Sequence, residues 1–406
     1  MTRKYNVKDE IWSFVFKKGK VRDKDFVQEF IRSDENPCGK IARGTFYKHR
    51  KELLDEGKIE IRSEKVASRF VPFYYVPEVF RWELMTRKLL YTIGDCKLEF
   101  IRWYGTGESK DEFAIRDVIC QYEDRSIPLS EELRSIKGRI LKEKSEEAKE
   151  KGQVFDDNPH YKLLKIQLGR EFIEETRDRK QRVCLTYGPT DFLSCLATNL
   201  SLDKHLSRDD QGHPVTIRDR CLKVHDLGDP TYLQSSPLAN SFGIALATLT
   251  QDDKILLQKR SHQVALGPEK LTVATAEIML RDRDVDKNGK PSPFITAQRC
   301  VKAELGVEIR PEDAVFLLFG VRLDYGLPQA LGILRLRMRS DELPTSYKAI
   351  DKWEGFNFPE EFSVGALKKY LFEPRASLIS DTAKLTIVSA LVNQYGFEEV
   401  EKHLLR

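Results

Sequence analysis

Basic and hydroxyl side chains gather between residues 43 and 69, where they have the types and spacing for nucleic-acid chemistry. A helix is expected over residues 44–56, with Phe46, Leu53 and Leu54 pointing inward. The polar residues that could then point outward are Arg43, Thr45, Tyr47, Lys48 and Lys51. Lysine and arginine bind phosphates or guanine edges, and hydroxyl groups position the backbone of a duplex. This pattern predicts a DNA-binding face; its alternative is a charged, solvated helix that contacts another protein.

Short elements on either side would hold this helix in place. Two helices are expected before it, over residues 8–17 and 25–32, because their apolar residues recur at helical spacing. Gly57 ends the helix, and two strands at 58–62 and 69–76 are expected to form a hairpin after it. Three basic residues belong to that hairpin, where they would meet flanking phosphates: Arg62, Lys65 and Arg69.

The segment GTFYKHRKELLDEGKIEI, together with this order of elements, resembles the recognition helix and following strand of winged helix-turn-helix domains. The domain expected from the resemblance is residues 1–77. The resemblance implies double-stranded DNA as the partner, with helix 44–56 in the major groove and the hairpin as the wing. Arg50 departs from the pattern, because its position is usually apolar. Either its side chain reaches solvent from the edge of the core, or the register is shifted by one residue.

Charge is distributed unevenly along the chain. Residues 1–76 hold 18 lysines and arginines against 12 aspartates and glutamates, a net charge of +6. The rest of the chain holds 50 basic against 52 acidic residues, a net charge of −2. A basic module on a nearly neutral body favours a polyanionic partner at one end only.

Composition limits the class of protein. The 406 residues suggest two or three domains, and 40% hydrophobic with 33% charged residues is typical of globular chains. The seven cysteines are an odd number with no C-x2-C pair, which argues against a zinc ribbon or a disulfide-bonded scaffold. No apolar run is long enough to span a membrane, and the N-terminus lacks the apolar core of a signal peptide. We therefore expect a soluble cytoplasmic protein with reduced thiols and no membrane partner.

Residues 78–182 are expected to be mostly helical. The candidate helices are 80–92, 112–122, 130–151 and one that begins at Asn158 and Pro159. In the last of these, apolar residues recur at spacings of three and four: Tyr161, Leu164, Leu168 and Phe172. This helical middle segment would pack between the two ends of the chain or form a homodimer. A solvated helical linker is the alternative.

Residues 183–406 mix strands and helices. A strand at 183–187 leads to a helix capped by Thr190 or Asp191 that is expected to reach about residue 206, and a hairpin is expected over 241–260. Further strands are expected at 271–280, 315–324 and 330–338, helices at 296–305 (capped by Thr296) and 381–395, and a charged loop at 281–293. This order indicates an α+β layered domain with its core at about 241–395. The fold class expected for the whole chain is therefore α+β multidomain.

The segment NSFGIALATLTQDDKILLQKRS resembles the opening hairpin of Nudix domains, and AQRCVKAELGVEI resembles the helical half of the Nudix box. The positions that match the box are Arg299, Val301, Glu304, Gly306 and Val307. The resemblance implies an α/β/α sandwich with a pocket for a nucleotide-type ligand. The residues expected to line it are Lys259, Arg260, Arg299 and Glu304. The first two would reach phosphates, or would simply give a strand a solvated end.

Departures from the Nudix box decide the expected chemistry. In the family, glutamates of the helix hold divalent cations, but here the first two glutamate positions are Cys300 and Ala303. Glu304 remains, with Glu277 near the interrupted first half of the box. One or two carboxylates hold Mg²⁺ poorly, because its dehydration needs compensating charge. We therefore expect no metal, no cofactor and no catalytic residue. Should hydrolysis survive, Glu304 would be the residue acting with Mg²⁺.

Three functions follow from these patterns. The first is a DNA-binding transcription regulator whose degenerate Nudix-like domain senses a nucleotide-type ligand or mediates assembly, with a dimer as its expected form. The second is a divergent Nudix pyrophosphatase that acts on a nucleoside diphosphate derivative. The third is a non-catalytic module that binds other proteins.

Overall fold

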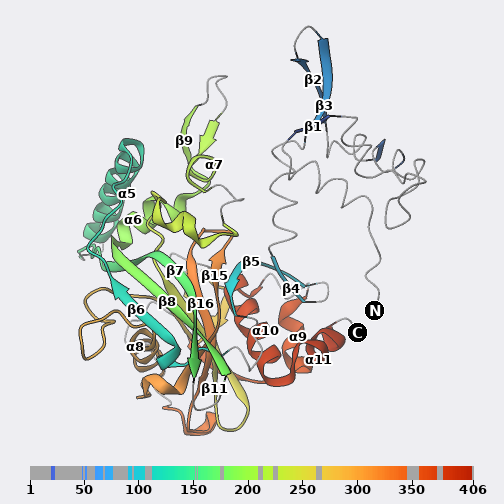
Figure 1. The fold of residues 1–406 in the computed structure, drawn as a ribbon. Coiled ribbons are helices and arrows are strands. Elements are labelled where there is room, and N and C mark those ends of the chain that lie inside the picture. Colours follow the sequence, from blue (N-terminus) through green and yellow to red (C-terminus); the bar gives the residue numbers. More distant parts are fainter. Residues whose placement is uncertain are drawn as a thin grey trace. The chain divides into compact units, whose positions relative to one another are not determined.

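The computed structural model divides the chain into two compact units, Met1–Lys88 and Leu89–Arg406 (Figure 1). In the first unit the described residues are 20–22, 48, 51–52, 60–66 and 69–75. In the second they are 90–93, 96–105, 112–150, 152, 154–173, 178–208, 214–222, 227–261, 268–344, 356–372 and 378–404. The domain boundaries expected after residues 77 and 182 stay predictions.

The first unit contains a three-stranded antiparallel sheet of order β1-β3-β2. Strands β2 (Glu60–Val66) and β3 (Arg69–Tyr75) form the hairpin expected near the end of this unit. Strand β1 (Lys20–Arg22) pairs with the other side of β3. Residues 48, 51 and 52 are helical, as expected within the third helix, whereas the helices expected over 8–17 and 25–32 lie outside the described residues.

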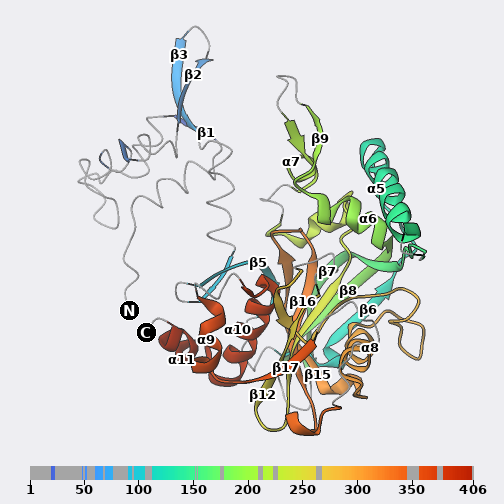
Figure 2. The ribbon, with the colours of Figure 1, turned by 180° about the vertical axis from the view of Figure 1, so that it is seen from behind.

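A mixed nine-stranded sheet forms the body of the second unit (Figures 1 and 2). Its order is β13-β12-β11-β16-β15-β5-β4, with β14 and β17 paired to β11 and β12. Strands β11 (Gly243–Leu249) and β12 (Lys254–Lys259) are antiparallel, which confirms the expected hairpin. Strand β16 (Pro328–Arg335) is parallel to β11 and antiparallel to β15 (Ala314–Arg322). The other strands are β4 (Leu90–Ile93), β5 (Cys96–Tyr104), β13 (Leu271–Val273), β14 (Thr275–Ile278) and β17 (Phe356–Glu361).

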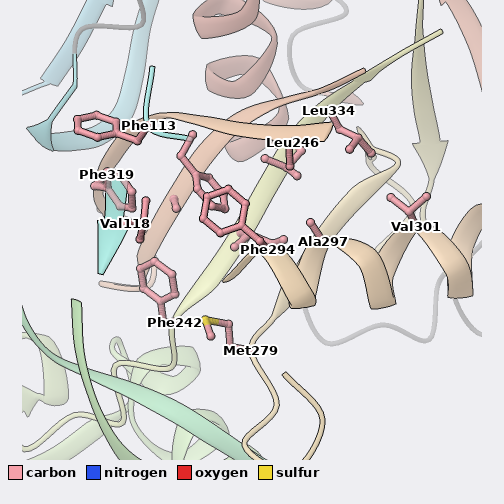
Figure 3. Close-up of a cluster of buried hydrophobic side chains, with 14 of the residues drawn as sticks. Phe113, Val118, Phe242, Leu246, Met279, Phe294, Ala297, Val301, Phe319 and Leu334 are labelled. Carbon is pink, nitrogen blue, oxygen red and sulfur yellow. The ribbon is translucent and has the colours of Figure 1, made fainter. Parts of the chain in front are cut away.

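The central strands of this sheet are buried on both faces. Every residue of β11 is buried, and alternate side chains join two different cores, as the pleat of a strand requires. One core is shared with helices α9 (Val364–Leu371), α10 (Asp381–Tyr395) and α11 (Phe397–Leu404). The other core is shared with α8 (Pro293–Leu305). Figure 3 shows the second core, where three α8 residues, Phe294, Ala297 and Val301, lie beside side chains from the sheet.

A second, smaller sheet packs beside the α8 side, because its buried residues belong to the same core. Its order is β6-β8-β7, with β6 parallel to β8 and β7 antiparallel to it. The start of β7 also bonds to the large sheet, since Tyr161 N donates to the carbonyl of Met279 at 3.1 Å and accepts at its own carbonyl from Phe242 N at 2.9 Å. The bounds are β6 (Val118–Tyr122), β7 (Pro159–Ile173) and β8 (Asp178–Asp191).

Smaller elements surround this second sheet. Helix α5 (Glu131–Glu150) matches the expected helix 130–151 and buries Leu133, Ile136 and Ile140. The remaining elements are α6 (Phe192–Ala197), β9 (His205–Arg208), β10 (Pro214–Thr216) and α7 (Ile217–Cys221). Strands β9 and β10 form a hairpin that projects from the body in both views (Figures 1 and 2).

The expected helical middle segment is wrong in large part. The helix expected from Asn158 is strand β7, the helix expected over 112–122 is a 3-10 turn followed by β6, and residues 90–92 of the helix expected over 80–92 belong to β4. In β7 the register shifts between Leu163 and Lys165. Such a bulge puts two apolar neighbours in sequence and breaks strict alternation, so part of the strand also satisfies a spacing of three and four.

Helix ends follow the sequence signals more closely, although two expectations need correction. Asp191 caps α6 by accepting from Ser194 N at 2.6 Å, but the helix ends at Ala197 instead of near residue 206. Helix α8 begins at Pro293, not after Thr296, because proline suits the first helical turn. Gly306 ends α8 with a φ of 65°, a left-handed conformation that glycine adopts without strain.

Candidate ligand site and nucleic-acid interface

Arg299, expected at the ligand site, is bound within the protein instead. Its guanidinium meets the carboxylate of Asp284 at two points, with Nε 2.8 Å from Oδ1 and Nη2 2.9 Å from Oδ2. Nη2 also donates to the carbonyl of Ile278 at 3.0 Å. Burial alone would lower the pKa of Arg299, but hydrogen bonding to Asp284 and the nearby carboxylates raise it above its ordinary value. The pair fastens the loop after β14 to helix α8.

Glu304 is buried and is bound by amides. Its carboxylate accepts from the side chain of Gln258 on β12, with Nε2 2.5 Å from Oε2. Its main-chain carbonyl accepts from Nδ2 of Asn357 on β17 at 3.2 Å. Gln258 and Asn357 are cross-strand partners, so one pair of strands supplies both amide groups. The structure therefore places Glu304 in an amide cluster with different partners from those of Arg299.

The two basic residues at the end of β12 differ in exposure. Lys259 is exposed, whereas Arg260 is partly buried and its main-chain N–H donates to the carbonyl of Lys270 at 3.0 Å. Neighbouring residues of a strand point to opposite faces, so Lys259 points away from the face of Gln258, and Arg260 follows the last residue of the strand. The four residues expected to line one ligand site thus differ in their neighbours and in their exposure.

The carboxylates of this region do not form a set that fits Mg²⁺. Asp284 and Glu277 both face Arg299, the latter with Oε2 3.5 Å from Nη1, and Glu304 is bound by Gln258. Within the described ranges, no group of three or more histidine, cysteine, aspartate or glutamate residues could hold a metal ion. Mg²⁺ needs several oxygen ligands in octahedral geometry, and it would compete here with an arginine for two of the carboxylates.

The basic residues of the first unit are described only in part. Lys48 and Lys51 are exposed on helical backbone. Arg62 and Lys65 belong to β2, paired with Phe73 and Phe70, and Arg69 begins β3. The other three predicted DNA contacts, Arg43, Thr45 and Tyr47, lie outside the described residues.

Two buried polar residues at the start of β7 are absent from the sites expected from the sequence. The Nδ1 atom of His160 lies 3.3 Å from Oγ of Ser241, and burial lowers the pKa of His160 to about 4. Lys162 is 3% exposed, and its Nζ donates to the carbonyls of Ser236 at 2.9 Å and Leu238 at 2.6 Å. Burial lowers the pKa of Lys162 to about 8. The signal in the sequence is a lysine between the apolar residues Tyr161 and Leu163, but the helical spacing of its neighbours conceals it.

Comparisons with known proteins find distant structural similarity only. No protein-family model and no curated protein matches the sequence. The Bacillus subtilis PadR structure in complex with operator DNA matches at 20% identity over 21% of this chain and 48% of its own, with a TM-score of 0.17. A MutT/Nudix family protein from Enterococcus faecalis matches at 17% identity over 30% of this chain and 43% of its own, with a TM-score of 0.22.

A MutT protein from Methanosarcina mazei Go1 matches at 11% identity over 40% of this chain and 93% of its own, with a TM-score of 0.24. The chain thus spans about half the length of the first two structures. The chain therefore has distant structural similarity to a DNA-binding regulator and to MutT/Nudix proteins. In the part of the chain that the structure describes, no helix is long and apolar enough to cross a membrane.

Proposed function

We propose that the chain is a DNA-binding transcription regulator with a winged helix in its first unit and a Nudix-like domain that binds a ligand or mediates assembly. The observation that carries the second half of the proposal is the internal use of the box residues. Glu304, the box glutamate that remains, is bound by Gln258, and Asp284 and Glu277 face Arg299, so these carboxylates are engaged in pairs within the protein.

Charge and local structure support the first half of the proposal. The first 76 residues carry a net charge of +6, and Lys48 and Lys51 are exposed on helical backbone in the same unit as a three-stranded sheet. A basic helix beside a hairpin is the arrangement by which winged helices meet a duplex. The residues proposed to contact DNA are Arg43, Thr45, Tyr47, Lys48, Lys51, Arg62, Lys65 and Arg69.

Ligand binding is proposed for the second unit at the amide cluster. Of the four residues first expected there, Glu304 on α8 contacts Gln258 of this cluster, and Lys259 and Arg260 follow Gln258 in sequence, whereas Arg299 is paired with Asp284. A ligand would regulate DNA binding only if it bound the DNA-competent and incompetent states with different affinity. A homodimer would present two recognition helices to half-sites about 34 Å apart.

The experiment that tests this function measures binding of the full chain to random and genomic duplex DNA at several salt concentrations. We expect the affinity of the chain for DNA to fall steeply as the salt concentration rises, because bound cationic residues release counterions from the phosphates. No binding at low salt would contradict it and favour a module that binds proteins. Sequencing the DNA retained by the protein would identify any preferred site.

The preserved buried carboxylate of Glu304 favours one alternative, a divergent Nudix pyrophosphatase that uses Mg²⁺. Release of phosphate or a nucleoside monophosphate from a panel of nucleoside diphosphate derivatives would support this alternative. Loss of that release in Glu304→Gln would assign it to the box residue.

A further inference from the structure

Asn240 is fully buried, and its side chain has no partner among the described residues. The residue is 0% exposed, and within the part of the chain that the structure describes, neither Nδ2 nor Oδ1 has a hydrogen-bond partner. Its main chain is fully bonded: N donates to Oδ1 of Asn199 at 2.9 Å, and the carbonyl accepts from Leu163 N at 3.1 Å. Buried polar groups are nearly always paired, because a buried group without a partner destabilises the folded chain. The carboxamide therefore has donor and acceptor capacity for a bound molecule.

The backbone conformation at Asn240 is a second unusual feature of this residue. Its φ is 44°, in the left-handed region that a residue with a side chain adopts at a cost. Such conformations persist where the surroundings enforce them, and they gather at ligand sites. Here the enforcing contacts are the bonds of Ala239 N to Thr198 Oγ1 at 3.0 Å and of Asn240 N to Asn199. The loop is thus held firmly with an unpaired carboxamide inside it.

A buried cation lies beside this loop. Lys162 reaches the carbonyl of Leu238, two residues before Asn240, and an isolated bridge pairs Lys162 with Ser241, one residue after it. Residues two apart in a chain are at most about 7 Å apart, so the Lys162 ammonium lies close to the backbone at Asn240. The partners of Nζ in the described structure are two main-chain carbonyls, which carry no formal charge. An ammonium has three N–H donors, so one remains for another acceptor.

We propose that Asn240 and Lys162 form an internal binding site for a small oxyanion that carries a hydroxyl group, such as hydrogen phosphate or hydrogen carbonate. The anion would balance the buried ammonium, because buried charges are stable when paired. Its oxygen atoms would accept from Lys162 Nζ and Asn240 Nδ2. Its hydroxyl would donate to Asn240 Oδ1, so that both orphaned atoms gain partners.

The site is separate from the amide cluster proposed to bind a ligand, and it does not depend on DNA binding. It lies where β7 crosses the loop that leads into β11, which joins the small sheet to the large one. An anion there would stabilise the junction of the two sheets in the second unit.

The test uses the full-length protein and measures the midpoint of thermal unfolding against the concentration of phosphate, hydrogen carbonate and sulfate at constant ionic strength and pH 7. The proposal expects a saturable rise with phosphate or hydrogen carbonate, since a ligand that binds only the folded state stabilises it. Sulfate is the matched control, because it is an oxyanion without a hydroxyl at this pH. Calorimetric titration gives the affinity.

Two variants assign the effect to the site. Asn240→Gly removes the carboxamide while glycine accepts the positive φ, so this variant is expected to fold. Lys162→Met removes the charge while keeping the apolar stem. Each is expected to weaken anion binding at least about tenfold, as loss of a charged hydrogen bond does. Asn393→Ala, which removes a different amide, one bonded to Glu112, should leave the affinity unchanged.

Several results would overturn the proposal. The first is an equal rise of the unfolding midpoint with sulfate. The second is a rise of the midpoint that persists in both variants. The third is an unchanged midpoint with every anion. A high-resolution crystal structure grown in phosphate that places only water at the Asn240 carboxamide would also overturn it.

Discussion

Arg299 and Asp284 form a two-point ion pair in which the carboxylate is fully buried, with contacts of 2.8 Å and 2.9 Å. Asp284 also accepts from Leu280 N at 2.7 Å, so the pair links helix α8 to the end of β14 and to the charged loop that follows. The guanidinium of Arg299 therefore holds the start of this loop against α8.

Replacing Arg299 should destabilise the second unit strongly. Arg299→Ala would leave the carboxylate of Asp284 buried without its cation, which costs about 3–5 kcal/mol. Urea unfolding followed by fluorescence would measure the loss, with Arg337→Ala as the control because its pair with Asp313 is largely exposed on the arginine side. An equal and small effect in both variants would mean that the pair does not anchor the loop.

The stability of the folded chain should decrease as the pH is lowered from about 6.5 to 4, because His160 becomes protonated more easily in the unfolded chain. Burial lowers the pKa of His160 to about 4 in the folded chain, so its neutral form is favoured there and protonation favours unfolding. Its contribution of about 3 kcal/mol is present above the unfolded pKa and is lost as pH falls through the folded pKa. Denaturant unfolding of the protein and of His160→Gln across this range would show a shallower pH dependence in the variant. The exposed His403→Gln is the control, and identical slopes in all three proteins would contradict the prediction.

Mg²⁺ should bind the chain weakly. Glu304 is bound by Gln258, and Asp284 and Glu277 face Arg299, so a cation that used these carboxylates would have to break these pairs. Calorimetric titration of the full chain is expected to give no stoichiometric binding at micromolar Mg²⁺. Tight binding that disappears in Glu304→Gln would instead favour the pyrophosphatase.

Lys48 and Lys51 should contribute to DNA affinity without specifying sequence. Both are exposed on helical backbone, and each phosphate that a lysine no longer neutralises reduces the slope of log affinity against log salt by about 0.9. The double variant Lys48→Ala, Lys51→Ala should therefore bind more weakly and with a slope shallower by up to about 2. Fluorescence anisotropy over a salt series measures both. The exposed Lys144→Ala, Lys149→Ala pair on α5 is the control, and unchanged binding in the first pair would show that this helix does not contact DNA.

Gly320 should not tolerate a side chain. A Cβ at this position on β15 would collide with the carbonyl oxygen of Ile101 and the ring of Phe100, both on the paired strand β5. Gly320→Ala is expected to cost several kcal/mol, of order 3, because the backbone contact cannot give way. Gly138→Ala, in the open on α5, should change stability by less than about 1 kcal/mol and in the opposite direction. Thermal unfolding of the two variants compares their midpoints. Similar midpoints would mean that β5 does not pack against Gly320.

Local signals in the sequence predict several elements closely. Helix α10 has the expected bounds, the hairpin of β11 and β12 is present, and Asp191 and Gly306 act as the cap and the stop that their residue types indicate. Each of these features depends on residues within one turn or one hairpin. Caps and turns are therefore readable from a short segment.

The partners of the candidate site residues cannot be inferred in this way. Gln258 meets Glu304 across 46 residues, and the bond between Lys162 and Leu238 spans 76. Strand β7 resembles a helix in sequence because a bulge disguises its period. The basic first unit and the local ends of helices follow from composition and short-range geometry, so the amino-acid order alone is enough to establish them. Only the tertiary structure decides which charged side chains pair with each other inside the protein. Such pairs join segments far apart in the sequence, and the sheets bring those segments together.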